Sequence, residues 1–332
     1  MNKTLENVLE ILASLFIVGG LLYVAFYVKP SVTVPGYTPT MFAYRDHYYS
    51  VVSPDRQHKV FWAVGNNGKI IRSDNAGDTW HIQKSGTKRN LQSMAPWDSR
   101  SAIVVGDLAT VLTTDDGGES WSKSPIETYE FGDQLLQVYA DPASGEAWLS
   151  GTMATVMRSK DRGKSWKMMH AQEDLAWNDI TVAPDGSVWV VGEFGRMQRS
   201  VDDGASWQEI ETPTSGSSLM AIAFADRQHG LVVGLSGTVF SSADGGDSWT
   251  LVPDVTQAHF FDVSWNGEYF VAIGDTGVLA IFSEDGQPVH VGRIHANNSG
   301  WYTQVTPLSA DRLLIAGSNL GLHIGKEWHV FQ

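Results

Sequence analysis

One short pattern recurs through most of the chain and constrains its fold more than any other feature. It reads Ser/Thr-x-Asp-x-Gly-x-Ser/Thr-Trp and occurs five times in clear form, at 73–80, 114–121, 159–166, 200–207 and 242–249. A degenerate sixth copy begins at Ser283, with His290 at the tryptophan position. Of the seventh copy only Trp328 remains. A repeat at a fixed interval indicates an array of similar structural units.

The intervals between successive tryptophan positions are 41, 45, 41, 42, 41 and 38 residues, with His290 counted as one of them. Each interval also holds an apolar stretch that ends in Gly-x-x-Gly or a near form, such as VGNNG from Val64 and VGEFG from Val191. Every unit therefore reads strand, turn, strand, Gly-rich turn, strand, boxed turn, strand. Four short strands in 41–45 residues are typical of one propeller blade, so the chain is predicted to be an all-β, seven-bladed β-propeller that starts near Tyr48.

The boxed turn is interpreted as a folding device, with a functional role for its residues as the minor alternative. Its Asp or Asn caps local N–H groups, its Gly takes a left-handed conformation, and its Trp packs inward at the start of the outer strand. The glycines of Gly-x-x-Gly are expected to supply the positive φ of tight hairpins. The box residues with this predicted role are Asn75, Trp80, Asp116, Trp121, Asp161, Trp166, Asp202, Trp207, Asp244 and Trp249; Trp207 and Trp249 are expected to be buried.

The N-terminus divides the chain into three predicted parts: a transmembrane anchor at 1–28, a Pro-rich linker at 29–44 and the propeller at 45–332. The anchor rests on an 18-residue apolar run at 11–28, long enough to cross a bilayer, and a cleaved signal peptide is the alternative. Within the linker, 37–44 is expected to add a strand that fastens the ring. Flanking lysines are nearly balanced, but an uncleaved N-terminal signal favours a single-pass inner (cytoplasmic) membrane protein with its propeller in the periplasm.

Composition excludes several classes of function. The chain has no cysteine, so disulfides, thiolate catalysis and zinc–cysteine sites are excluded. Its formal net charge of −14 argues against a nucleic-acid partner, because such a surface repels phosphate backbones. The ten histidines lack His-x-His and His-Glu-x-x-His spacings, and the boxes hold too few carboxylates for a calcium loop. We therefore expect no metal and no cofactor.

The repeat unit resembles that of the photosystem II stability and assembly factor family, and AIAFADRQHGLVVGLSGTVFSSADGGDSW at 221–249 shows this best. The resemblance covers about 45–332. It implies a seven-bladed, non-enzymatic propeller that helps to assemble a membrane protein complex from the lumenal or periplasmic side. Related propellers of non-photosynthetic bacteria are associated with transporters of the resistance-nodulation-division type. The photosynthetic role is not carried over, because the chain has no cysteine for the lipid that cyanobacterial relatives carry, and its overall charge is acidic whereas those relatives use an arginine-rich patch.

Candidate partner-binding residues fall into two groups. A basic cluster carries Arg158, Lys160, Arg162 and Lys164, with Arg196 and Arg199 on the next blade; a solvated charge run is the alternative reading. The loops after each fourth strand should share one rim with the Gly-x-x-Gly turns. That rim offers Glu193, Phe194, Trp177, Trp301 and Tyr302 for protein recognition, although Trp177 and Trp301 could instead belong to the core.

The predicted function is that of an accessory subunit, scaffold or assembly factor for an integral membrane protein complex. A module for a glycan or lipid-like ligand is the alternative. Boxed turns also occur in sialidase-like glycoside hydrolases, but the Phe/Tyr-Arg-x-Pro segment of that class is missing, and Tyr44-Arg45-Asp46-His47 is the nearest equivalent. No catalytic residue is predicted, and the chain is not expected to be an enzyme.

Overall fold

The computed structural model describes residues 3–27, 41–43, 45–213 and 216–332. The chain divides into two compact units, Met1–Thr40 and Met41–Gln332. The described part of the first unit is the helix α1, Lys3–Tyr27. No helix within the described residues has the length and apolar character needed to cross a membrane. The anchor at 1–28 therefore stays a prediction, and residues 28–40 of the anchor and linker lie outside the described residues.

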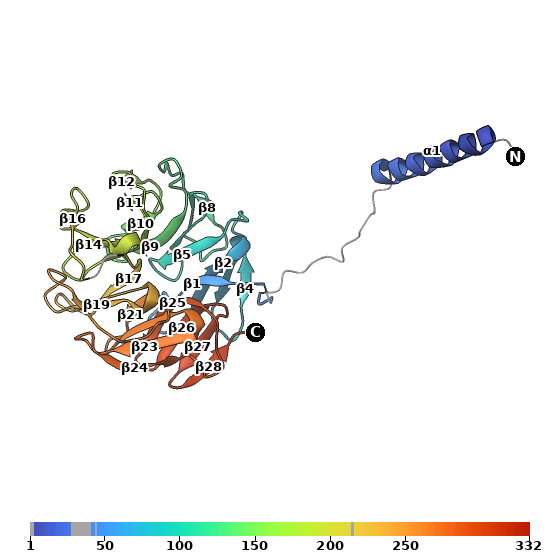
Figure 1. The fold of residues 1–332 in the computed structure, drawn as a ribbon. Coiled ribbons are helices and arrows are strands. Elements are labelled where there is room, and N and C mark those ends of the chain that lie inside the picture. Colours follow the sequence, from blue (N-terminus) through green and yellow to red (C-terminus); the bar gives the residue numbers. More distant parts are fainter. Residues whose placement is uncertain (1–2, 28–40, 44, 214–215) are drawn as a thin grey trace. The chain divides into compact units, whose positions relative to one another are not determined.

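The second unit is a ring of seven four-stranded antiparallel sheets, each built from one continuous stretch of chain (Figure 1). Blade 1 contains β1 Tyr48–Val52, β2 Phe61–Gly65, β3 Ile70–Ser73 and β4 His81–Gln83. Blade 2 contains β5 Leu91–Pro96, β6 Ala102–Gly106, β7 Thr110–Thr114 and β8 Ser122–Lys123. Blade 3 contains β9 Leu135–Ala140, β10 Ala147–Gly151, β11 Val156–Ser159 and β12 Lys167–Met168. Blade 4 contains β13 Trp177–Val182, β14 Val188–Gly192, β15 Met197–Ser200 and β16 Gln208–Glu209.

Blade 5 contains β17 Leu219–Phe224, β18 Gly230–Gly234, β19 Val239–Ser242 and β20 Thr250–Leu251. Blade 6 contains β21 Phe260–Trp265, β22 Phe270–Gly274, β23 Val278–Phe282 and β24 Pro288–Arg293. Blade 7 contains β25 Tyr302–Ser309, β26 Arg312–Gly317, β27 Gly321–Ile324 and β28 Glu327–Val330. Short 3₁₀ turns are η1 Asn66–Gly68, η2 Glu193–Gly195, η3 Leu235–Gly237 and η4 Asp275–Gly277. The predicted all-β propeller, its seven blades and its start near Tyr48 are confirmed.

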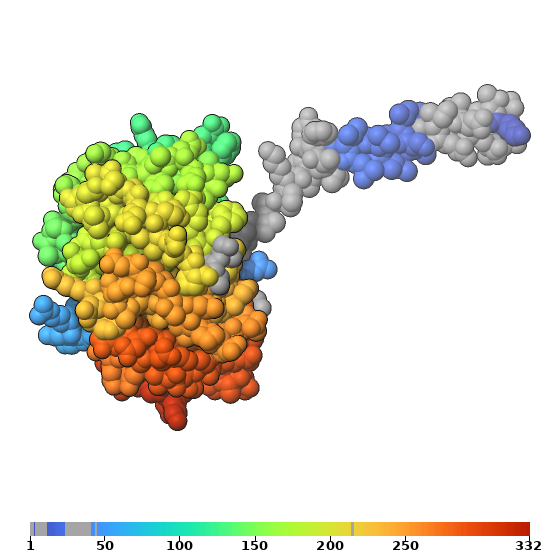
Figure 2. Space-filling view, turned by 60° about the vertical axis from the view of Figure 1, so that its left-hand side comes forward, coloured from blue at the N-terminus to red at the C-terminus, as the bar shows by residue number. Residues whose placement is uncertain are grey.

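The up-and-down order of strands gives the ring two distinct faces. The turns between second and third strands and the connections between blades lie at one end of every sheet, here called the mouth face. The turns between first and second strands and the boxed turns lie at the other end, the box face. In the space-filling view the blades from yellow-green to red follow one another in chain order (Figure 2).

Each boxed turn is closed by its own side chains, as the sequence predicts. In blade 4 the Ser206 N–H donates to Asp202 Oδ1 at 2.8 Å, and the Gly204 N–H donates to Ser200 Oγ at 2.8 Å. The box glycines have φ between 78° and 93°. Hydrogen bonds from the Ser206 hydroxyl and N–H lower the pKa of Asp202 to about 2, so this carboxylate is ionised at neutral pH.

The boxed turn also joins each blade to the preceding one, which the sequence did not reveal. Trp249 of blade 5 packs edge-on against Trp189 of blade 4, with ring centroids 6.0 Å apart. A Cβ added at Gly246 would come within 2.4 Å of the Trp189 ring, so only glycine allows this approach. We call the boundary between consecutive blades a seam.

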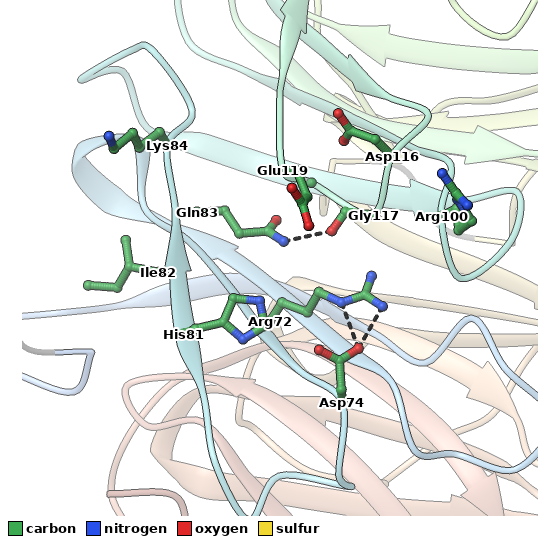
Figure 3. Close-up of a pocket in the computed structure, with 11 residues that line it drawn as sticks. Arg72, Asp74, His81, Ile82, Gln83, Lys84, Arg100, Asp116, Gly117 and Glu119 are labelled. Carbon is green, nitrogen blue, oxygen red and sulfur yellow. Dashed lines mark hydrogen bonds and ion pairs between the residues drawn. The ribbon is translucent and has the colours of Figure 1, made fainter.

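At the seam between blades 1 and 2 a boxed turn again contacts the preceding blade, and here the contact includes hydrogen bonds of a glutamine side chain. Gln83 accepts hydrogen bonds from Trp62 Nε1 and Trp121 Nε1, both at 3.2 Å. Its amide nitrogen donates to Gly117 O at 2.8 Å (Figure 3). Beside it, Arg72 stacks over the Trp62 ring and pairs with Asp74 at 2.7 Å. The hollow drawn in Figure 3, of about 700 Å³, is therefore part of this seam, and its Arg72 and Asp74 pair with each other.

The first glycine of each Gly-x-x-Gly has a different role from the one expected. Gly65, Gly192 and Gly234 have φ between −161° and −167°, which is extended backbone open to any residue. The restriction is space, because a Cβ at Gly65 would lie 1.9 Å from the His47 carbonyl oxygen. Only the later glycines of the motif, such as Gly68 at φ 71°, use the left-handed region.

The extra fastening strand expected at 37–44 is not seen where the chain is described, because residues 41–43 form a turn. Phe42 in this turn packs beside Tyr48, Trp80 and the near-C-terminal Phe331, and so covers the seam between blades 7 and 1. Residues 37–40 and 44 lie outside the described residues. Within the ring, the Val51 N–H of blade 1 donates to Gln304 Oε1 of blade 7 at 3.0 Å.

The box tryptophans Trp207 and Trp249, both expected to be buried, differ in burial. Trp249 is buried, whereas Trp207 is only partly buried. Replacing Trp249 by Ala removes an aromatic that fills the seam, and we expect it to lower the free energy of unfolding by about 3–5 kcal/mol. Trp207→Ala is the matched comparison and should cost less. Denaturant titration measures both, and a loss below about 1 kcal/mol for Trp249 would contradict this account of the seam.

Candidate functional site

Every inner strand carries a β-bulge at its second residue. The register of each first-to-second strand pair skips one position there, for example between Trp177 and Asp179 of β13 and between Leu219 and Ala221 of β17. A bulge re-aims a side chain and commonly occurs next to functional sites. The seven skipped residues are Tyr49, Gln92, Leu136, Asn178, Met220, Phe261 and Thr303.

All seven bulge residues line one cavity at the mouth of the central channel, with a volume of about 530 Å³. Ser93, Gln137, Trp301 and Gln304 complete its lining. We call it the channel-mouth cavity. None of these lining side chains is a carboxylate, a histidine or a basic group.

The lining has an aromatic part and an amide part. The rings of Tyr49 and Trp301 are stacked, with centroids 5.9 Å apart and planes 22° from parallel, and Phe261, Leu136 and Met220 add apolar surface. Asparagine and glutamine side chains face the same space, each able to donate and accept a hydrogen bond. This combination suits an uncharged ligand with apolar side groups and amide bonds.

Just below the bulge, the third residue of most inner strands joins neighbouring blades around the channel, with Ala221 of β17 as an exception. The Met94 N–H donates to Ser50 Oγ at 3.0 Å, and the Val305 N–H donates to Asp262 Oδ2 at 2.7 Å. Asp179 accepts from two N–H groups, those of Ile180 and Ile222, at 2.8 and 2.9 Å. The carboxylate of Asp179 can satisfy both of these buried N–H donors because it has two acceptor oxygens.

The two aspartates are buried, and burial is the largest influence on their protonation. Burial raises the pKa of Asp179 to about 6, despite the N–H groups that favour its charged form. Burial also raises the pKa of Asp262 well above the usual range, and the charge of Asp179 adds to this. Since their oxygens are occupied by backbone donors, we assign both residues a structural role.

The aromatic residues predicted to bind a partner fall into three groups: those that line the cavity, those that are buried in the core and those that are exposed on the mouth face. Trp301 lines the channel-mouth cavity as expected of a binding residue. Trp177 and Tyr302 are first residues of inner strands and fully buried, so the prediction that they meet a partner is wrong. The pattern did not reveal the bulge, which turns Asn178 and Thr303 toward the cavity instead. Phe194 is exposed on the mouth face, and Glu193 beside it accepts the Ala176 N–H at 2.8 Å.

The predicted basic cluster does not form one patch. Arg196 follows a mouth-face turn and is paired with Glu173 and Glu209, whereas Lys160, Arg162 and Lys164 belong to a boxed turn on the opposite face. Arg158 is buried, pairs with Glu146 at 2.8 Å and lies over the Trp148 ring. Arg199 pairs with Asp247 of the next boxed turn and lies over Trp189. Arg158 also lies 3.2 Å from Asp203 in the boxed turn of blade 4, so Arg158 and Arg199 each join their blade to the next boxed turn.

One group of potential metal ligands arises from residues far apart in the sequence. Within the described part of the chain, ligand atoms of Asp226, His229 and Glu284 lie within 4.8 Å of one another. His229 Nδ1 is 3.0 Å from Asp226 Oδ2, and this hydrogen bond, with Asp285 and Glu284 nearby, raises the histidine pKa. The group bridges blades 5 and 6, at the seam where His290 replaces the box tryptophan. We therefore assign it to ion pairing across that seam.

Comparison with known proteins agrees with this geometry. The family model described as photosynthesis system II assembly factor YCF48 matches residues 83–177 and 205–310, which are more than half of the chain. The chain belongs to this family. Photosystem II assembly protein Ycf48 of Thermosynechococcus vestitus is 36% identical over 63 residues. That match spans only 18% of this chain and 18% of the Thermosynechococcus protein.

Two solved structures of the YCF48 family share the fold. One, described as YCF48 bound to D1 peptide, has a TM-score of 0.67 at 20% identity and covers 85% of this chain and 94% of its own. The other, YCF48 from Cyanidioschyzon merolae, has a TM-score of 0.66 at 16% identity and covers 84% and 95%. At these identities the likeness shows a common propeller fold.

The buried aspartates predict how the stability of this YCF48-family propeller depends on pH. A carboxyl with a raised folded-state pKa gives stability that is fully present below its unfolded pKa and is lost as pH rises through the folded pKa. For Asp179 this window runs from about pH 4 to about 6, and the loss is about 3 kcal/mol.

Asp179→Asn should therefore flatten the fall in the free energy of unfolding across this window. The measurement is chemical denaturation at several pH values, with Asp174→Asn, an exposed aspartate, as the control that keeps the wild-type slope. An unchanged slope in Asp179→Asn would contradict the assignment.

Proposed function

We propose that the protein is a non-enzymatic accessory or assembly factor of a membrane protein complex, and that its channel-mouth cavity holds an extended segment of the partner. The observation that carries the proposal is the lining of that cavity. Stacked aromatic rings meet a set of neutral amides there. Amide side chains pair with the N–H and C=O groups of a peptide, and aromatic or aliphatic surfaces take its apolar side chains.

Three features support binding over catalysis. The cavity lining contains no carboxylate pair, histidine or basic group that could transfer protons or stabilise a developing charge. Asp179 and Asp262, just below the bulges, are held by backbone N–H groups. Asp107 accepts hydrogen bonds from the side-chain amides of Asn90 and Gln92. A solved relative of the same fold is described as bound to D1 peptide, which supports a peptide as the class of ligand. A glycan or lipid-like ligand is the alternative.

The identity of the complex goes beyond the family assignment. We propose an integral membrane partner other than a photosystem, with a transporter of the resistance-nodulation-division type as the first class to examine. We also propose that the apolar run at 11–28 anchors the chain in the inner membrane and leaves the propeller in the periplasm. An alkaline phosphatase fusion after Gln332 tests this topology. Activity is expected, and an inactive fusion beside an active cytoplasmic reporter at the same position would overturn it.

The binding proposal predicts the effect of a charge placed in the cavity. Met220→Glu puts a carboxylate among uncharged groups, where burying it without a cation is costly. Affinity purification from membranes in mild detergent should recover an integral membrane protein with the wild type and lose it with Met220→Glu.

Val201→Glu is the matched control, because Val201 is exposed in a boxed turn on the opposite face. It should retain the partner. Equal recovery with both variants, or a clean monomer with the wild type, would contradict the proposal. Both variants should keep the wild-type Tm, which shows that the ring is intact.

A further inference from the structure

A second feature of the mouth face lies outside the channel-mouth cavity. The third residue of each Gly-x-x-Gly segment has a positive φ in blades 1 to 6. In blades 1, 5 and 6 it is Asn67, Ser236 and Thr276, which are small or polar. In blades 2, 3 and 4 the same position carries Leu108, Met153 and Phe194. Large apolar side chains at this position therefore occur on three consecutive blades.

These side chains are unfavourable for the fold in two ways. A bulky residue in the left-handed region is strained, whereas Asn adopts it readily. Phe194 and Leu108 also gain little from packing, because they are 61% and 47% exposed, whereas Met153 is half-buried. Phe131, in the connection between blades 2 and 3, repeats the combination with φ 63° and 76% exposure. Strain that contributes nothing inside the fold points to a contact outside it.

Hydrogen bonds connect the four positions into one surface. The Ala109 N–H donates to Asp133 O at 2.7 Å, which places the Leu108 turn beside the Phe131 loop. Thr152 Oγ1 donates to Phe131 O at 3.1 Å, next to Met153.

From Met153 the connection continues to blade 4. The Glu173 N–H reaches Met153 O at 3.5 Å, and the Glu193 N–H donates to Ala176 O at 3.1 Å, next to Phe194. We call the surface formed by Leu108, Phe131, Met153 and Phe194 the apolar crescent.

The charge around the apolar crescent indicates the chemistry of its partner. The turns and connections that form it carry the acidic residues Asp107, Glu127, Glu130, Asp133, Glu173, Asp174 and Glu193. In these segments Arg196 is already paired with Glu173 and Glu209. Exposed Lys88 and Arg89 lie in the connection to blade 2, whose Asn90 carbonyl accepts the Asp107 N–H, so the acidic border belongs to the Phe131, Met153 and Phe194 part of the surface rather than to its Leu108 end. A negatively charged border around exposed apolar groups favours a cationic ligand and disfavours anionic lipid headgroups.

We propose that the apolar crescent docks a basic, apolar segment of a partner protein, in which Leu- or Phe-type side chains alternate with Lys or Arg. Apolar anchors then cover Phe131 and Phe194, and the cations face Glu127 and Glu130, both exposed. This surface is separate from the channel-mouth cavity, and it does not depend on what that cavity binds.

The test uses two fluorescent 12-residue peptides, one of alternating Leu and Lys and one of alternating Leu and Glu, with binding followed by anisotropy on the full chain. The Leu/Lys peptide is expected to bind at least tenfold more tightly. The triple variant Leu108→Asn, Phe131→Ser, Phe194→Asn should lose at least tenfold in affinity. Phe194→Asn alone should keep or raise Tm, because Asn fits the left-handed backbone. The control variant Val201→Ser, Val289→Ser removes exposed apolar groups elsewhere and should bind like the wild type.

Each other result overturns the proposal. Unchanged affinity in the triple variant means that the apolar crescent is not the site. A clear fall in Tm with Phe194→Asn means that the phenylalanine packs within the fold. Sedimentation with phosphatidylglycerol/phosphatidylethanolamine vesicles, without peptide binding, identifies a lipid surface instead. Met220→Glu, which blocks the channel-mouth cavity, should leave peptide binding unchanged, so that failure of the two proposals can be told apart.

Discussion

The contact of each boxed turn with the preceding blade is the interaction on which the rest of the propeller depends. A four-stranded blade has two edges and a flat apolar face, and it is stable only when neighbours cover them. The box glycine lets its turn approach the second strand of the previous blade, as Gly246 does at Trp189, and the box tryptophan fills the space beside it. The motif that reveals the repeat in the sequence is thus also what closes one blade onto the next.

The seams show how this contact is varied. In blades 3 and 4 the tryptophan of the second strand, which the next boxed turn contacts, is also covered by an arginine of the third strand. Arg158 lies over Trp148, and Arg199 lies over Trp189. Between blades 5 and 6 the box tryptophan is replaced by His290, and across this boundary His229 lies 3.9 Å from Glu284 and 3.6 Å from Asp285. A second set of links runs around the channel, where Ser50, Asp179, Asp262 and Gln304 each accept an N–H from the next blade. Together these contacts give the mouth face a rigid frame.

The sequence predicted the fold closely because its turn chemistry is local. Serine, aspartate and glycine of one box satisfy each other within eight residues, so spacing alone located seven blades and their strands. The binding surface was harder to predict, because it depends on a bulge. Trp177 and Asn178 are neighbours in an apolar strand, and only the skipped register turns the asparagine, rather than the tryptophan, into the cavity. The arginines likewise looked like a patch in the sequence, although their partners come from other turns and the next blade.

The central claim is that the mouth face, through its channel-mouth cavity, contacts a membrane protein. Site-specific photo-crosslinking in intact cells tests this most directly. A photoreactive amino acid is placed at Phe261, in the cavity lining, and separately at Val201, on the opposite face. The account predicts an adduct with an integral membrane protein from position 261 and none from position 201. An adduct from position 201 alone, or no membrane protein at position 261, would contradict it.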